Sequence, residues 1–375
     1  MKIIGTRIDR YSRQPQGAGG SGEVAARDYG GGILVVSIDT DTGLTGVGFV
    51  SASAASAPLL AAMGKALFAP ILDGANPWET THLWDRLYHE AAPRRGGDGL
   101  MRHLLAAIDC ALWDIKAKAA NVPVWQLLGG NRSLVPTYAN CAHHLPVEQL
   151  AERAASYVDA GHRALKIRGT RSFVTPAEAT RRVAAVREAI GPDVRLMVDV
   201  NGSWDVDTAI RQLRDWEAYD VYWLEEPVPP QDLAGYRRVR EHAGSTFIVG
   251  GEQHVGLAEF KNLIDSDCID IAQPNVVMTG GITDWLRIHA YATACGIPVS
   301  PWNLQQVHIH LAAGLPNVQW IEYFMADNAL LEFQGELLQG SRLEEVVGED
   351  GVYLQAPTQP GLGIHINTDM RPDPA

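Results

Sequence analysis

The chain has 375 residues, of which 46% are hydrophobic and 20% charged, so it holds enough apolar surface for one large core or two smaller ones. This composition excludes intrinsic disorder as the main state. The 44 Asp and Glu outnumber the 31 Lys and Arg, and the resulting net charge of −13 argues against nucleic acid and anionic membranes as partners.

The amino-terminal segment and the cysteines favour a soluble cytoplasmic protein. The segment MKIIGTRIDRYSRQ lacks the apolar stretch of a signal peptide. No later segment has an uninterrupted apolar run long enough to cross a bilayer. The four cysteines stand singly in apolar surroundings, without the paired spacing of zinc or redox sites, so we expect them to be reduced.

Two patterns in succession predict a first lobe over residues 1–130. Residues 1–50 alternate in a strand-like way, and the turn-rich sequence DTGLTGVGFV predicts an antiparallel ladder. Residues 82–118 carry apolar side chains three and four positions apart, which is typical of helices. The sequence AANVPVWQLLGG then ends the region with proline and glycine. We therefore expect strands followed by helices.

Residues 131–335 alternate short apolar runs with amphipathic helical stretches, which predicts a parallel sheet. Eight candidate strands begin near residues 134, 163, 195, 221, 247, 268, 297 and 319. Eight such units match a (β/α)8 barrel of the TIM type, and the fold class is therefore α/β. A doubly wound open sheet is the alternative, but no glycine-rich phosphate loop follows the first strand.

Signals for the start and end of a helix support the barrel assignment, whereas the end of the chain does not continue the strand–helix alternation. Thr175 followed by Pro176 predicts the start of a helix, and Gly191 predicts its end. Residues 336–375 contain strand-like pieces but no ninth unit, so we expect this tail to return to the first lobe.

Three acids end successive predicted strands: Asp199 the third, Glu225 the fourth and Glu252 the fifth. Active sites of parallel barrels lie at the carboxyl ends of the strands, and neighbouring strands are about 4.8 Å apart, so these carboxylates should converge. Such a cluster requires a cation, and oxygen ligands favour Mg²⁺, with Mn²⁺ as the alternative. Each acid alone could simply cap a helix, but three in register favour a metal site.

The second predicted strand ends in Lys166 and Arg168, which the two-residue period places together on the barrel interior. Two buried cations side by side lower the pKa of a lysine, so Lys166 is a candidate base near neutral pH. Arg168 should stay protonated. The alternative is that both are counter-ions of the three acids.

With the barrel, these residues resemble the enolase superfamily, specifically its mandelate racemase subgroup. The resemblance spans nearly the whole chain and includes ALWDIKAKAANVPVWQLLGG, WLEEPVPP, GGEQ, QPNVVMTGGITDW and HLAAGLPNVQWIEYF. It implies a modified barrel under an α+β capping domain built from both chain ends. Residues 1–130 and 336–375 would form the cap, and residues 131–335 the barrel.

The resemblance also implies roles for single residues. The three acids would be the Mg²⁺ ligands. Glu322, in the eighth strand, would hydrogen-bond the substrate carboxylate as it becomes an enediolate. Asn140 and Asn201 fall where the family places substrate contacts.

Two departures from the subgroup pattern bear on the reaction. Asn275 and Trp302 stand where the subgroup has an Asp on strand six and a His on strand seven, so the usual second base is absent, and we expect both to contact substrate. Arg168 stands at the usual second Lys and is a poor proton acceptor. The candidate catalytic residues are therefore Lys166, as the base, with Arg168 and Glu322.

Reactions of this family begin by removing the proton α to a carboxylate, with Mg²⁺ stabilising the product anion. Racemisation needs a base on each face of the carbon, whereas β-elimination can use one group first as base and then as acid. We therefore expect a Mg²⁺-dependent hydro-lyase that converts an acid sugar, an aldonate or aldarate, to a 2-keto-3-deoxy acid. The alternatives are a cycloisomerase of a sugar-acid lactone and a protein that binds a sugar acid without turnover. The partner would be a small-molecule carboxylate, and the family resemblance implies a homo-oligomer.

Overall fold

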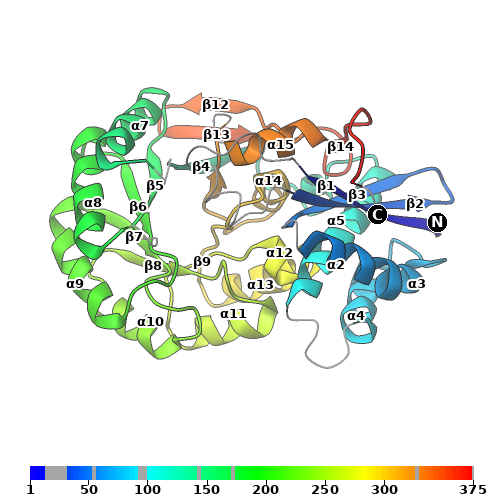
Figure 1. The fold of residues 1–375 in the computed structure, drawn as a ribbon, viewed down its shortest axis with the longest axis horizontal. Helices are drawn as coiled ribbons and strands as arrows, with labels where there is room; N and C mark the ends of the chain where they lie inside the picture. The colour runs from blue at the N-terminus through cyan, green and yellow to red at the C-terminus, as the bar shows by residue number, and fades with distance from the viewer. Residues whose placement is uncertain are drawn as a thin grey trace.

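The computed structural model describes residues 1–12, 32–52, 56–91, 99–141, 145–169, 174–325 and 329–373. Two lobes make up the molecule, and both chain ends lie in the smaller one, which contains the first three strands (Figure 1). The larger lobe is a ring of strands surrounded by helices (Figure 1). The glycine-rich segment of residues 13–31 lies outside the described residues.

The first lobe is an antiparallel three-stranded sheet with helices, as the alternation of residues 1–50 predicts. The sheet order is β1-β2-β3. Its strands are β1 (Ile3–Ser12), β2 (Gly32–Thr40) and β3 (Thr45–Ala52). Its helices are α2 (Ser56–Met63), η1 (Gly64–Phe68), α3 (Ala69–Leu72), α4 (Thr80–Glu90), α5 (Leu100–Ala119) and α6 (Val124–Leu127).

Helix α5 lies directly on the backbone of β3. A Cβ added at Gly48 would lie 1.8 Å from the carbonyl oxygen of Ala107, and one added at Gly46 would lie 2.2 Å from that of Ala111. No side chain larger than hydrogen fits at either position, so the two glycines set the distance between sheet and helix.

The second lobe is a closed parallel barrel. Strands β4 to β9 pair in sequence order, and β10 pairs with β4 to close the ring. Val299 bridges Ala272 on one side and Val318 on the other, in place of the expected seventh strand. Pro298 and Pro301 flank this bridge and cannot donate to a ladder, which explains its shortness. The strands are β4 (Leu134–Asn140), β5 (Ala164–Arg168), β6 (Arg195–Asp199), β7 (Val221–Glu225), β8 (Phe247–Gly250), β9 (Ile271–Ala272) and β10 (Ile321–Tyr323).

Helices follow the barrel strands and form its outer layer. The helix predicted at Thr175 begins there, because the Thr175 side chain accepts a hydrogen bond from the Glu178 N–H, and it ends at Gly191 with φ 76°. Among the described residues, no helix is both long and apolar enough to span a membrane. The barrel helices are α7 (Val147–Asp159), α8 (Pro176–Ile190), α9 (Val206–Trp216), η3 (Glu217–Tyr219), α10 (Leu233–Arg240), α11 (Gly256–Asp265), α12 (Val276–Thr279), α13 (Ile282–Ala294) and α14 (Gln305–Gly314).

The tail divides between the two lobes. It contains α15 (Ala329–Leu337), β11 (Leu338–Gln339), β12 (Glu345–Gly348), β13 (Gly351–Gln355) and β14 (His365–Ile366). The β12–β13 hairpin adds to the barrel, because β13 pairs antiparallel with the start of β4.

Beyond this hairpin the chain returns to the first lobe. The Leu362 N–H donates to Asp114 Oδ1 (2.7 Å), and Trp125 Nε1 donates to the Pro357 carbonyl (2.7 Å). The same Asp114 carboxylate accepts from the Val47 N–H in the first sheet. The division into residues 1–130, 131–335 and 336–375 stays a prediction.

Gly48→Ala should lower the free energy of unfolding by roughly 1–3 kcal/mol, because the added methyl group overlaps the α5 backbone. Thermal unfolding followed by circular dichroism would show a lower midpoint. Gly5→Ala is the matched control, since its added Cβ has its nearest neighbour at 3.7 Å. Equal midpoints for the two variants would contradict the assigned contact.

Candidate metal centre and active site

Three buried carboxylates meet at the carboxyl ends of adjacent barrel strands. Asp199 ends β6, Glu225 ends β7, and Glu252 follows β8. The parallel register sets Asp199 directly beside Glu225. One oxygen from each of the three side chains lies within 4.8 Å of the others. The convergence expected from the strand ends is therefore present.

The donor set fits a hard divalent cation. All three side chains are 5% exposed or less, and Glu252 Oε2 has no hydrogen-bond partner among the described residues. Burial raises the pKa of Glu225 to about 7 and that of Glu252 well above its usual range. Carboxylates this deeply buried require a compensating charge, and an all-oxygen set suits Mg²⁺ or Mn²⁺.

The two cations of the second barrel strand lie inside the barrel, and each pairs with a carboxylate. Lys166 Nζ lies 2.7 Å from Glu225 Oε1 and 2.9 Å from Glu322 Oε1. Arg168 forms an ion pair of 2.7 Å with Asp199 Oδ2. Both cations therefore sit as counter-ions in the structure.

The expectation that Arg168 lowers the pKa of Lys166 is wrong. Burial does lower the pKa of Lys166, but the charges of Glu225 and Glu322 outweigh it and raise that pKa well above its usual value. Two acids surround the lysine: Glu225 on β7, and Glu322 on β10, which barrel closure brings beside it.

Glu322 is held in one orientation by three donors. Asn140 Nδ2 donates to its Oε1 (2.7 Å), and the Asn303 N–H donates to its Oε2 (3.0 Å). Lys166 is the third. Glu322 and Asn140 thus lie together, as expected for residues at the ends of neighbouring strands.

The other three residues predicted to contact substrate differ in how exposed they are to solvent. Asn201 is exposed, and its Nδ2 donates to Glu252 Oε1 (2.9 Å), which places it at the carboxylate cluster. Asn275 is buried and caps α12, where its Oδ1 accepts from the Val277 N–H (2.7 Å). Trp302 is half-buried. The two residues after it, Asn303 and Leu304, have φ values of 58° and 42°.

Sequence reasoning missed the amide side chains that orient the carboxylates. Gln273 Nε2 donates to Glu225 Oε2 (2.8 Å), and Gln253 Nε2 donates to Glu226 Oε2 (2.5 Å). Burial raises the pKa of Glu226 to about 8. A signal was available, since Gln253 directly follows a predicted ligand and Gln273 follows the sixth strand.

Two family models cover most of the chain. Residues 30–129 match the mandelate racemase/muconate lactonizing enzyme N-terminal domain, and residues 149–370 match the enolase C-terminal domain-like family. The chain belongs to the mandelate racemase/muconate lactonizing enzyme family. The resemblance drawn from the sequence motifs is thereby confirmed, as is the barrel with its capping lobe.

Members of this family with related sequences carry out several named reactions. The L-talarate/galactarate dehydratase of Salmonella typhimurium is 33% identical over 82% of this chain and 77% of its own. The 3,6-anhydro-alpha-L-galactonate cycloisomerase of Streptomyces coelicolor is 31% identical over 88% of both chains.

Solved structures of family members superpose over almost the entire length. A racemase from Streptomyces coelicolor A3(2) with bound magnesium has a TM-score of 0.84 at 29% identity and covers 98% of both chains. L-Talarate dehydratase from Polaromonas sp. JS666, complexed with Mg and L-glucarate, has a TM-score of 0.83 at 31% identity, covering 98% of this chain and 96% of its own.

Stabilisation by Mg²⁺ should increase with pH. Because the folded-state pKa values of Glu225 and Glu252 are raised, the metal-free protein should lose stability as pH rises through about 7. Below that pH, protons compete with Mg²⁺ for the same carboxylates, so the metal binds more weakly. The increase in unfolding temperature on adding Mg²⁺ should therefore be larger at pH 8 than at pH 6.

Differential scanning fluorimetry with and without EDTA measures this increase. Glu252→Gln should abolish most of it, whereas Glu241→Gln, on the exposed surface, should leave it intact. An increase that is independent of pH, or one retained in Glu252→Gln, would count against the assigned metal centre.

Proposed function

We propose that this protein is a Mg²⁺-dependent hydro-lyase that removes water from an acid sugar, an aldonate or aldarate, to give a 2-keto-3-deoxy acid. The observation that carries the proposal is the position of Lys166 beside both Glu225 and Glu322. This arrangement sets a proton-accepting side chain between a metal-binding carboxylate and an acid that can bind substrate. The named activity of the 33%-identical Salmonella dehydratase supports the same reaction class.

The Lys166–Glu322 pair needs one proton transfer to become active. Lys166 carries a proton in the structure's ion pair, and Glu322 Oε1 lies 2.9 Å away. Moving that proton to Glu322 yields a neutral amine, which is a base, and a protonated carboxyl, which is a hydrogen-bond donor. Asn140 and the Asn303 N–H hold Glu322 in place for this role.

The neutral amine then removes the proton α to the substrate carboxylate. The C–H bond breaks, and its electron pair moves toward the carboxylate, to which Glu322 donates its hydrogen bond. When bound, Mg²⁺ supplies Lewis-acid stabilisation of the charge on that carboxylate.

In the second step the electron pair forms a C=C bond and the C–O bond at the β carbon breaks. Lys166, now protonated, gives its proton to the departing hydroxide, and water leaves. The remaining enol tautomerises to the 2-keto-3-deoxy acid. One residue thus serves first as base and then as acid, which requires that the proton and the hydroxyl leave from the same face.

We propose that four further residues contact the substrate: Asn140, Asn201, Asn275 and Trp302. Asn140 and Asn201 already hydrogen-bond to site carboxylates. Trp302 offers an aromatic face on which the carbon skeleton of a sugar can stack. Arg168, paired with Asp199, is proposed to hold that carboxylate in position.

A lactone cycloisomerase is the second candidate, because it also needs proton transfer on only one face. It is favoured by the Streptomyces coelicolor relative named a cycloisomerase, which aligns with 88% of this chain. Racemisation is disfavoured, since Asn275 and Trp302 occupy the positions where the subgroup carries its second base.

We also propose a cytoplasmic homo-oligomer, on the sequence features and the family membership given above. Light scattering coupled to size exclusion should give a mass that is a multiple of the chain mass. A monomer mass across the micromolar range would refute the oligomer.

Lys166→Ala should lower turnover by roughly 10²–10⁴-fold, because the general base is lost. Purified Mg²⁺-loaded protein would be screened against mono- and diacid sugars and their lactones, with 2-keto acids detected by semicarbazide and EDTA as a control. Lys261→Ala, on the exposed side of α11, is the matched variant and should retain turnover.

The same variants separate the remaining alternatives. Mg²⁺-dependent stabilisation retained in Lys166→Ala shows that the variant is folded. Undiminished turnover in that variant would refute Lys166 as the base. Silence of the Mg²⁺-loaded wild type across the library would favour the binding protein without turnover.

A further inference from the structure

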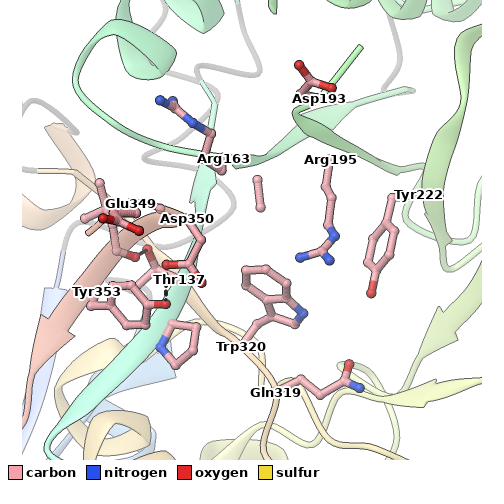
Figure 2. A pocket seen from close by; sticks show the side chains of 14 residues that line it. Thr137, Arg163, Asp193, Arg195, Tyr222, Gln319, Trp320, Glu349, Asp350 and Tyr353 are labelled. Atoms are coloured by element: carbon pink, nitrogen blue, oxygen red, sulfur yellow. Dashed lines mark hydrogen bonds between the residues drawn. The ribbon is translucent and has the colours of Figure 1, made fainter. Parts of the chain in front are cut away.

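A hollow opens at the end of the barrel opposite the metal centre. It has a volume of about 590 Å³ and is lined by the starts of the barrel strands and by the turn between β12 and β13 (Figure 2). The side chains that matter to its chemistry are Arg163, Asp193, Arg195, Tyr222, Trp320 and Glu349.

This hollow is separate from the proposed active site. Arg195 begins β6 and Asp199 ends it, so the two residues lie about 13 Å apart along the strand. Buried side chains, among them Met197 and Trp223, fill the barrel between the two ends. Tyr222 and Trp320, which are partly buried, pack against these side chains.

Arg195 is held by aromatic rings and keeps its hydrogen-bond donors available. Its guanidinium carbon lies 5.1 Å from the ring centroids of both Tyr222 and Trp320. Figure 2 shows the guanidinium between these two rings, at the centre of the hollow. Within the described residues, Arg195 makes no side-chain hydrogen bond or ion pair. Its planar N–H edge is thus positioned to bind a carboxylate.

The other charged groups at the hollow restrict the class of ligand that can bind there. Arg163 donates to the carbonyl groups of Val158 and His162, so it is already engaged. Asp350 also lines the hollow and accepts a hydrogen bond from the Tyr353 hydroxyl (2.7 Å), whereas Asp193 and Glu349 supply acceptors for hydroxyl groups. These acids would repel a multiply charged anion, but they suit a ligand with one carboxylate and several hydroxyls.

From these contacts we infer that the hollow is a second binding site, for a small polyhydroxylated carboxylate. The carboxylate pairs with Arg195, the hydroxyls donate to Asp193 and Glu349, and the C–H face of the ligand stacks on Trp320. This inference does not depend on the proposed reaction.

Calorimetric titration of D-galactonate into EDTA-treated protein carrying Asp199→Asn tests the site without turnover or metal-dependent binding. Saturable binding is expected, and adding Arg195→Gln should weaken it at least tenfold. Arg238→Gln is the matched control, since it removes an exposed guanidinium on α10, away from the hollow, and should change nothing. Inorganic phosphate should bind at least tenfold more weakly than D-galactonate.

Three outcomes would overturn the inference: no saturable binding of D-galactonate, equal affinity in Arg195→Gln, or phosphate binding as tightly as D-galactonate. Asp193→Ala provides a second, independent variant on an exposed side chain. It should weaken D-galactonate binding without weakening acetate binding, because acetate has no hydroxyl group to donate to Asp193. Because the assay uses protein without turnover, its failure leaves the proposed reaction unaffected.

Discussion

The buried charge at the carboxyl ends of the barrel strands is the constraint on which the rest of the site depends. Five carboxyl groups and two cations are buried there, so full ionisation of the acids would leave three negative charges uncompensated in a low-dielectric interior. A divalent cation reduces this excess, and hydrogen bonds from amide side chains disperse more of it. The five acids are Asp199, Glu225, Glu226, Glu252 and Glu322, and the cations are Lys166 and Arg168.

The capping lobe is joined to the barrel by buried polar contacts that fix the two parts in one arrangement. Trp84 Nε1 donates to the Gly280 carbonyl (2.7 Å), and Asp109 accepts from both the hydroxyl and the N–H of Thr283. These bonds tie α4 and α5 to the start of α13. Because α5 in turn lies on the backbone of β3, this helix contacts both the first sheet and the barrel helix α13.

The features that sequence could predict were those set by local periodicity and strand ends. The carboxylates of Asp199, Glu225 and Glu252 meet because parallel strands end at one edge, and this follows from spacing alone. The charge state of Lys166 could not be predicted in this way. It depends on ion pairs with Glu225, two strands away, and with Glu322, which is 156 residues later in sequence and reaches the lysine only when the barrel closes. The division of the tail between the lobes likewise depends on pairing with β4, for which the sequence holds no local signal.

The bond between Asp114 and Leu362 has a consequence for synthesis of the protein. The two residues are 248 positions apart, yet the bond completes the packing of a lobe whose other parts come from the beginning of the chain. On a ribosome the first sheet and α5 emerge early and must wait for the last segment. The contacts of Asp114 in the first lobe are therefore completed only after Leu362 has been synthesised, although the sheet and α5 of that lobe are translated first.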